Sequence, residues 1–137
     1  MKIFKRIILA ILIISILLIG SITLMGYIMY HNAISQTSIA DKIAKIKSNE
    51  NYTSINDIPD NFKNAIIAIE DHRFKEHNGI DLITTARSML ENIREKDIVA
   101  GGSTISQQTG RLLYFTQEQL FTRKVTELFV AFDLEKN

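Results

Sequence analysis

The sequence predicts a mostly α-helical protein with a single membrane-spanning helix at its N-terminus. Residues 7–30 form an uncharged run rich in Ile, Leu and Met. In the rest of the chain, apolar residues recur at the i, i+4, i+7 spacing of an amphipathic helix, and no stretch alternates convincingly between apolar and polar residues as a half-buried strand would. The length of 137 residues allows at most one domain beside the membrane helix.

The uncharged run is long enough to cross a lipid bilayer. At a rise of ~1.5 Å per residue it reaches about 36 Å, whereas the hydrocarbon core is about 30 Å thick. Lys2, Lys5 and Arg6 precede the run, so the N-terminus is expected in the cytoplasm and the rest of the chain outside. A cleaved signal peptide is the alternative, but its apolar region is normally about 7–15 residues and ends in small residues at a cleavage site. We therefore expect an uncleaved anchor.

Charge and cysteine content exclude two classes of protein. With the three basic residues of the N-terminal tip set aside, 13 Lys and Arg stand against 15 Asp and Glu, a net charge of −2. Nucleic-acid partners are not expected, because a nucleic-acid-binding domain is strongly basic on one face. The chain has no cysteine, which excludes a disulfide framework and thiolate metal sites, so the domain must be held together by packing.

Composition divides the chain into three parts. Residues 1–30 are expected to form the cytoplasmic tip and transmembrane anchor, residues 31–58 a stalk or linker, and residues 59–137 the folded domain. Within the stalk, Ile39, Ile43 and Ile46 share one helical face and predict a short helix over 38–47.

Four helices are expected in the domain, over residues 60–72, 81–95, 103–114 and 122 to the C-terminus. Asp60 or Asn61 can cap the first helix, and Thr104 with Gln107 fits a capping box at the start of the third. The predicted buried faces are Phe62, Ile66 and Ile69 in the first helix; Leu82, Ala86, Met89, Leu90 and Ile93 in the second; and Val125, Leu128, Phe129 and Phe132 in the fourth.

The segment 65–81 is the predicted chemical centre. An Ile-rich helix carries Glu70 at its end and then breaks into charged residues and His, a composition that local packing does not explain. Glu70 follows Ile66 by four residues, so it should lie at the border of the buried face. We therefore expect partial desolvation to raise its pKa and suit it to proton transfer.

Two further segments could contribute to a site. Gly101 and Gly102 precede a helix start, where backbone N–H groups favour anions, although an ordinary capped junction has the same pattern. Gln107 and Gln108 favour a polar cleft wall, since adjacent buried amides would be costly without partners. Glu127 follows Arg123 by one turn. Their spacing alone favours a surface ion pair worth about 0.2–0.5 kcal/mol over a phosphate-binding cation with a second acid.

A metal site made from histidines is not expected. His72 and His77 are five residues apart, which does not place them on one helical face, and no third ligand has a suitable spacing. We interpret His77 as a structural residue that forms hydrogen bonds near Gly79 and Asp81.

Taken together, the three segments resemble the motifs of the peptidoglycan glycosyltransferases. This lysozyme-like transglycosylase domain occurs in monofunctional enzymes and as the N-terminal domain of class A penicillin-binding proteins. The likeness covers residues 59–135, and the single anchor most resembles the monofunctional form. Residues 70–74 with His77, Gly79 and Asp81 resemble the first motif, residues 101–108 the second, and Arg123, Lys124 and Glu127 the third.

The resemblance implies a reaction. Members of the family polymerise lipid II into glycan at the outer face of the bacterial cytoplasmic membrane. By that likeness, Glu70 would be the general base on the acceptor 4-hydroxyl, and the transfer would invert the anomeric carbon and expel lipid pyrophosphate. Glu127 would support the pyrophosphate either directly, without a cofactor, or through a divalent cation such as Mg²⁺ or Mn²⁺. The implied partners are lipid II, the growing glycan chain, the membrane and other cell-wall synthases.

The resemblance also assigns roles to the other motif residues. Residues implied to bind substrate are Arg87, Ser103, Thr104, Gln107, Gln108, Arg111, Arg123 and Lys124. Residues implied to maintain the motifs are Asp71, Phe74, His77, Gly79, Asp81, Gly101 and Gly102.

The chain departs from the family pattern in two places. The family usually has Lys-Asn shortly after the paired glutamines, whereas this chain has residues 109–112, Thr-Gly-Arg-Leu. Arg111 can replace the lysine charge, but Leu112 cannot replace the asparagine's hydrogen bonds, and Gly110 costs about 1 kcal/mol inside a helix. The family also continues past the third motif, so we expect this chain to be the N-terminal part of such a domain, with impaired activity on its own.

Two other functions remain as alternatives. A membrane-anchored module could bind lipid II or a synthase without catalysis. A lysozyme-like hydrolase could cleave glycan, but the second and third motifs argue against it, because hydrolysis needs no pyrophosphate site.

Overall fold

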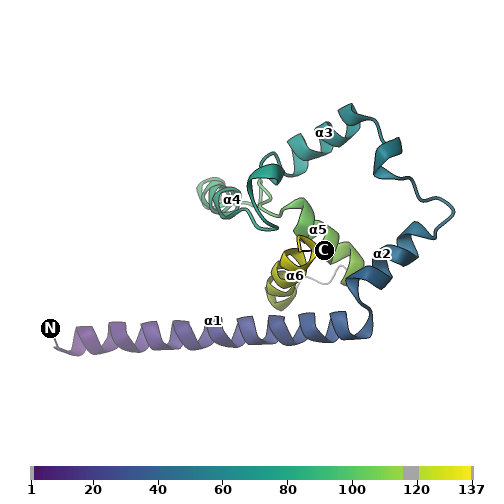
Figure 1. Ribbon diagram of the computed structural model, residues 1–137. Helices are drawn as coiled ribbons and strands as arrows, with labels where there is room; N and C mark the ends of the chain where they lie inside the picture. Colours follow the sequence, from purple (N-terminus) through teal and green to yellow (C-terminus); the bar gives the residue numbers. More distant parts are fainter. Residues whose placement is uncertain (1, 116–120, 137) are drawn as a thin grey trace.

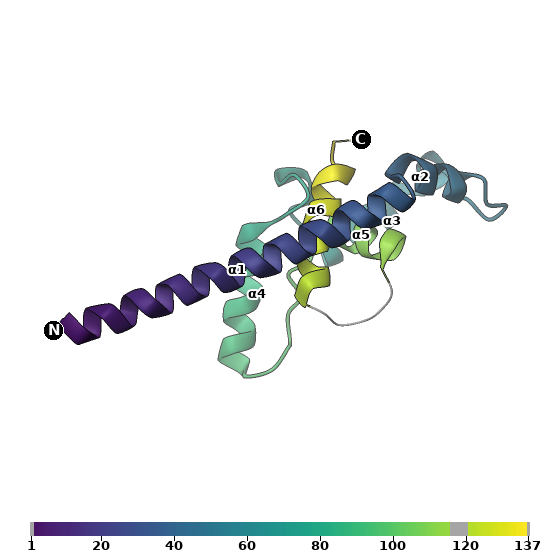
Figure 2. The ribbon, with the colours of Figure 1, turned by 90° about the horizontal axis from the view of Figure 1, so that it is seen from below.

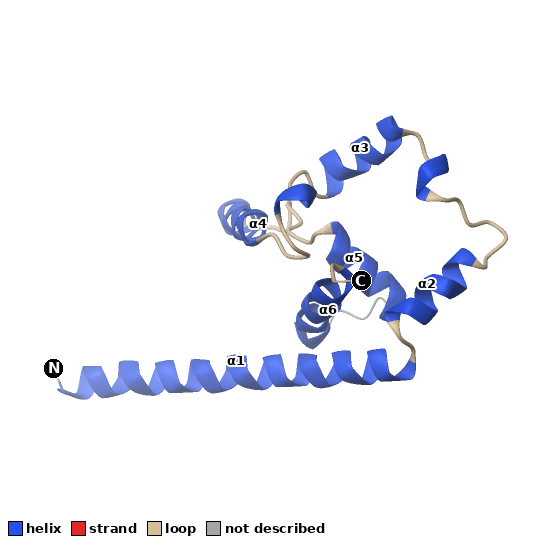
Figure 3. Ribbon diagram, viewed as in Figure 1, coloured by secondary structure: helices blue, strands red, loops and turns tan. Residues whose placement is uncertain are grey.

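The computed structural model describes residues 2–115 and 121–136, and this part of the chain is helical with no strand (Figures 1 and 3). The predicted mostly α fold is therefore confirmed. The helices are α1 (Lys2–Gln36), α2 (Ile39–Lys47), α3 (Asp60–Glu70), α4 (Leu82–Glu95), α5 (Ile105–Tyr114) and α6 (Phe121–Leu134), with 3₁₀ turns η1 (Ile55–Asp57) and η2 (Phe74–Glu76).

Helix α1 is longer than the predicted 24-residue run. Residues Ile3–Gln36 are long and apolar enough to cross a membrane, with a mean hydropathy of 3.0 in the most apolar window and none of that window buried. The helix continues without a break to Gln36 (Figure 2). Residues 31–36 of the predicted stalk are thus helical, and the division into anchor, stalk and domain remains a prediction.

Helix α6 packs between α1 and α5, and this is the main helix packing in the described ranges (Figure 1). Val130 and Ala131 of α6 are fully buried. Gly110 of α5 permits the close approach, because a Cβ there would lie 2.8 Å from Val130 Cγ1. The glycine that costs stability within its own helix therefore has a packing role between two helices.

The predicted buried faces of α3 and α4 are wrong. Phe62, Ile66 and Ile69 are exposed, with Ile69 at 81%, and Leu82, Met89, Leu90 and Ile93 are exposed as well. The physical reason is that α3 and α4 lie outside the α1–α6–α5 stack, so helical periodicity created apolar faces that no described helix covers (Figure 1).

The buried face of α6 also differs from the prediction. Thr126, Glu127, Val130 and Ala131 are buried, whereas Val125, Leu128 and Phe129 are only half-buried, and Phe132 is exposed. Two neighbours on different sides of α6 bury a broader face than a single apolar stripe predicts.

The predicted helix starts agree with the structure more closely than the predicted buried faces do. Asp81 caps α4 by accepting hydrogen bonds from the backbone of Ile83 and Thr84, and Thr104 with Gln107 forms the predicted capping box of α5. The N-cap position predicted for α3 is wrong, because Pro59 occupies it and makes no side-chain hydrogen bond. Asn61 lies inside the first turn, where its Oδ1 accepts a hydrogen bond of 2.9 Å from the backbone N–H of Phe62.

Helix α2 is held against the end of α5. Ile39 is buried, whereas Ile43 and Ile46 of its predicted face are exposed. The Lys42 ammonium lies 5.2 Å from the centroid of the Tyr114 ring, and the Tyr114 hydroxyl donates to the backbone carbonyl of Thr37 at 2.9 Å. Burial, together with Asp133 and Asp41, raises the pKa of Tyr114 and keeps this donor protonated.

Candidate active site

Glu70 is the last residue of α3, and its side chain is exposed. The predicted partial burial is wrong, because the end of α3 lies at the surface. Its Oε2 accepts a hydrogen bond of 2.9 Å from Gln108 Nε2 on α5. Glu70 also lines an open cavity of about 310 Å³ with Ile69, Gly101, Ser103, Gln108 and Arg111. The fold thus joins residues of the first and second predicted motifs around one carboxylate.

The loop after Glu70 is attached to the start of α5. Asp71 is buried, and its Oδ2 accepts from the backbone N–H of Ile105 at 3.0 Å. Both Asp71 carboxylate oxygens lie 3.0 Å from His77 Nε2. The Thr104 hydroxyl donates to the carbonyl of Gly79 at 2.7 Å. The predicted structural role of His77 agrees with this geometry, although its partner is Asp71.

Gly79 has a backbone role of its own. Its φ of +82° is in the left-handed region, and a Cβ there would lie 3.0 Å from the carbonyl oxygen of Ala131. Phe74, another residue of the first motif, packs edge-to-face on His77 with 6.2 Å between ring centroids.

Asp81 completes the loop. Its Oδ2 accepts from the Thr84 hydroxyl at 2.7 Å and lies 3.0 Å from Arg73 Nε. Burial alone would raise the pKa of Asp81, but hydrogen bonds from Thr84 and Ile83 and the charge of Arg73 lower it from 3.8 to about 2. Asp81 is therefore ionised and holds the start of α4.

Sequence reasoning missed a cluster in this loop. The ligand atoms of Asp71, His77 and Asp81 lie within 4.8 Å of one another, a grouping suited in type to a cation. The carboxylate pair at positions 71 and 81 was the available signal, but the metal hypothesis considered only His72 with His77. Because these carboxylates already accept from the backbone N–H groups of Ile105 and Ile83, we interpret the cluster as structural.

Two side chains of α4 hold the backbone at Gly101 and Gly102 in place. The Ser88 hydroxyl donates to the carbonyl of Gly101, and the Thr85 hydroxyl donates to that of Gly102, each at 3.0 Å. A Cβ on Gly102 would lie 2.9 Å from Thr85 Cα, so this position requires the close approach that glycine allows.

The two glutamines of the second motif have different environments. Gln107 is 2% exposed, and its Oε1 accepts from the backbone N–H of Thr104 in the capping box. Gln108 is only partly buried, and its side-chain amide donates a hydrogen bond to Glu70. The ordinary capped junction and the polar cleft wall are therefore both present in this segment.

Glu127 is the second carboxylate of interest, and it is 1% exposed. Its oxygens lie 3.2 Å from Arg123 Nε and 3.0 Å from Lys124 Nζ. The favoured interpretation of a surface ion pair is wrong, because α6 is enclosed between two helices. Two cations compensate the buried charge, as the cost of desolvating a carboxylate requires.

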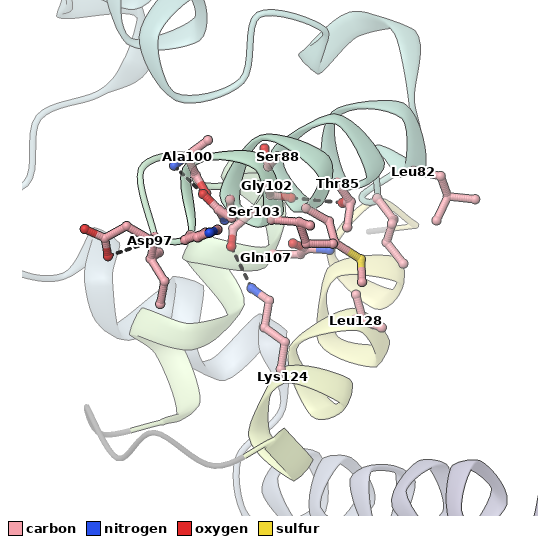
Figure 4. Close-up of a pocket in the computed structure, with 16 residues that line it drawn as sticks. Leu82, Thr85, Ser88, Asp97, Ala100, Gly102, Ser103, Gln107, Lys124 and Leu128 are labelled. Atoms are coloured by element: carbon pink, nitrogen blue, oxygen red, sulfur yellow. Dashed lines mark hydrogen bonds between the residues drawn. The ribbon is translucent and has the colours of Figure 1, made fainter. Parts of the chain in front are cut away.

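A larger cavity of about 960 Å³ lies beside this ion pair (Figure 4). Leu82, Met89, Ile93 and Leu128 supply apolar wall, and Lys124 lies at one side. Lys124 Nζ also donates to Ser103 Oγ at 2.6 Å, and Figure 4 shows this contact.

Ser103 connects the two halves of the site. It lines both cavities, so it lies between the Glu70 side and the Lys124–Glu127 side. Three predicted substrate-binding residues line neither cavity. The Thr104 hydroxyl is used in the capping box and by Gly79, Arg87 is exposed on α4, and Arg123 is paired with the buried Glu127. The arrangement offers a carboxylate base on one side and paired cations with apolar wall on the other.

Comparison with known proteins agrees with this geometry. The sequence model of the transglycosylase family matches residues 36–137. The chain belongs to the transglycosylase family. This membership confirms the resemblance predicted from the three motifs and the mostly α fold with part of a lysozyme-like domain.

Relatives within the transglycosylase family include monofunctional glycosyltransferases of Staphylococcus haemolyticus (strain JCSC1435) and Staphylococcus aureus (strain JH9). Each is 40% identical to this chain over 109 residues, which cover 80% of this chain and 39% of the relative. The transglycosylase chain thus spans about two fifths of the length of these relatives.

Proposed function

We propose that the chain acts in peptidoglycan synthesis as a membrane-anchored glycosyltransferase that polymerises lipid II into glycan strands with loss of lipid pyrophosphate. The observation that carries this proposal is that Ser103 lines the cavity of Glu70 and also accepts a hydrogen bond from Lys124, which is paired with Glu127. Glu70 is hydrogen-bonded to Gln108, and Glu127 is paired with Arg123 and Lys124.

The first side supplies a base. Glu70 is reachable from solvent, and Gln108 orients its carboxylate without occupying both oxygens. In the proposed step, Glu70 accepts the proton of an acceptor 4-hydroxyl while that oxygen attacks the donor's anomeric carbon from the face opposite the leaving group. The new glycosidic bond forms as the bond to pyrophosphate breaks, which inverts the anomeric centre.

The second side stabilises the leaving group. Negative charge grows on the pyrophosphate as its bond to the sugar breaks, and cations held in advance at that position lower the barrier. Arg123 and Lys124 supply the cations, and the buried Glu127 holds them in place. The apolar wall beside Lys124 suits a substrate that carries a lipid.

The membrane helix supports a lipid-linked substrate independently. Gly26, Tyr27 and Tyr30 contact α6, which carries Lys124 and Glu127. These residues lie at the end of the uncharged run, so the site would be near the membrane surface. We propose a cytoplasmic N-terminus and an extracytoplasmic site, as the basic tip predicts, with the cytoplasmic membrane as the location. A tethered site increases the effective concentration of a membrane-bound substrate.

The test is incorporation of labelled lipid II into glycan by the purified full chain in detergent. We expect polymer from the wild type and a loss of about 10²–10⁴-fold in Glu70→Gln, because that change removes the base with little change in shape. Glu91→Gln, at an exposed position of α4, is the matched control and should leave the rate unchanged.

Other outcomes would replace the proposal. Saturable lipid II binding without polymer, equal in wild type and Glu70→Gln, would support a non-catalytic binding module. Release of soluble fragments from purified cell wall would support a hydrolase.

A further inference from the structure

The membrane helix packs closely against α6 at Gly26. A Cβ on Gly26 would lie 2.6 Å from Val125 Cγ1, 2.8 Å from Val125 Cβ and 3.3 Å from the backbone nitrogen of Thr126. Real Cβ atoms almost never come closer than 3.0 Å to such atoms. Any other residue at position 26 must therefore move one of the two helices.

Polar and aromatic contacts hold α6 to α1 at this point and over the two turns that follow it. The Thr126 hydroxyl donates to the carbonyl of Gly26 at 3.1 Å. Two turns further along α6, the Tyr30 hydroxyl donates to Asp133 at 3.0 Å. Between them, Phe129 packs on the rings of Tyr27 and Tyr30, with centroids 5.5 and 5.8 Å apart. Specific hydrogen bonds and ring contacts therefore define how α6 packs against α1.

Helix α6 has no room to move toward α5, its other neighbour. Val130 already meets Gly110 of α5 so closely that a Cβ on that glycine would lie 2.8 Å away. A side chain at position 26 would therefore tilt α6 or slide it along its axis. Either motion moves Glu127, which follows Thr126 directly, and Lys124, which reaches across to Ser103.

We propose that Gly26 is a positioning residue for the transfer reaction: by admitting α6 against the membrane helix, it sets where Glu127 and Lys124 lie relative to Ser103. This inference rests on the proposed function. Gly26 precedes the residues that the family model matches, so the anchor acts here as part of the site's support as well as a tether.

The chain contains a matched control for this proposal. Gly20 lies on the same helix, and a Cβ there would meet nothing within 4 Å. The variants are Gly26→Ala, Gly26→Leu and Gly20→Leu, each in the full chain reconstituted in detergent micelles. Equal yields of helical protein by circular dichroism establish that each variant has folded.

We expect Gly26→Leu to lower kcat by about tenfold to a hundredfold with KM for lipid II within twofold, because misplacement by about 1 Å has effects of this size. Gly26→Ala should fall between that variant and the wild type, and Gly20→Leu should stay within twofold. Adding Val125→Gly to Gly26→Ala removes the atoms that clash, and kcat should return to within threefold of Val125→Gly alone. Equal kcat values for Gly26→Leu and Gly20→Leu would overturn the proposal.

A second readout does not need activity. Lys124 Nζ is engaged by Glu127 and Ser103, so displacement of α6 should release this amine from both contacts and make it more reactive. We expect acylation of Lys124 by a water-soluble active ester, measured by mass spectrometry, to become at least threefold faster in Gly26→Leu and to stay unchanged in Gly20→Leu. An inactive wild type would refute the proposed function, whereas unchanged Lys124 labelling in Gly26→Leu would refute the positioning.

Discussion

Replacement of Asp81 tests how the loop beneath Glu70 is held. The Asp81 carboxylate is 3% exposed, caps α4 through Ile83 and Thr84, and pairs with Arg73. Asp81→Asn keeps an oxygen that can accept the capping hydrogen bonds but removes the charge. Asp81→Ala removes both, so the two variants separate the cap from the charge.

The pKa of Asp81 sets the size of the charge effect. Lowering the pKa from 3.8 to about 2 stabilises the folded state at pH 7 by about 2 kcal/mol. We expect Asp81→Asn to lose about 2 kcal/mol and Asp81→Ala about 3 kcal/mol, since an N-cap contributes about 1 kcal/mol more.

The same values predict the pH dependence. Because the folded-state pKa is below the unfolded value, the stabilisation is complete above about pH 5 and is lost as the pH falls from 4 toward 2. The gap between the wild type and Asp81→Asn should therefore shrink to less than about 1 kcal/mol at pH 2.5.

Urea unfolding in a mild detergent, followed by far-UV circular dichroism at both pH values, measures these free energies. Asp57→Asn, at an exposed position, should match the wild type throughout. A gap that is absent at pH 7, or one that is as large at pH 2.5 as at pH 7, would refute the electrostatic reasoning.

Three further predictions concern other contacts of the site and its support. Gly79→Ala should lower the free energy of unfolding by about 1–3 kcal/mol, because φ is +82° and the new methyl group would lie 3.0 Å from a backbone carbonyl of α6; unchanged urea unfolding would contradict this. Gln108→Leu should leave stability within about 0.5 kcal/mol, since its bond to Glu70 is exposed, yet slow polymerisation about tenfold, and a normal rate in the lipid II assay would exclude an orienting role. Tyr114→Phe should cost about 1 kcal/mol by removing the hydrogen bond to Thr37, measured by the same unfolding experiment, and a smaller loss than about 0.3 kcal/mol would show that this bond does not hold α2 in place.

Helix starts could be predicted because their causes are local. Ser38, Asp81 and Thr104 each accept a hydrogen bond from a backbone N–H two or three residues ahead, and this pattern is visible in the sequence. The three motifs were found for the same reason, since each is a short run of residues. The N-cap prediction for α3 was wrong because Pro59 occupies that position, and proline has no side-chain hydrogen-bond acceptor.

Burial could not be predicted in the same way. Periodicity indicates which residues share a face, but it does not indicate whether another element covers that face. Ile69 and Leu90 therefore lie on apolar faces that are exposed, and Glu70 is exposed at the end of one of them. Glu127 belongs to a sequence pattern typical of a surface pair and is nevertheless almost completely buried.

The sequence by itself determined the N-terminal helix that is apolar and long enough to cross a membrane, the order of the helices and the three motifs, because apolar length, capping and short-range spacing are properties of neighbouring residues. Only the tertiary structure decided which charges are enclosed and which residues meet. Contacts between Gly26 and Val125, between Gln108 and Glu70, and between Ser103 and Lys124 join distant parts of the chain. Their positions depend on how the helices stack, and no local pattern encodes that arrangement.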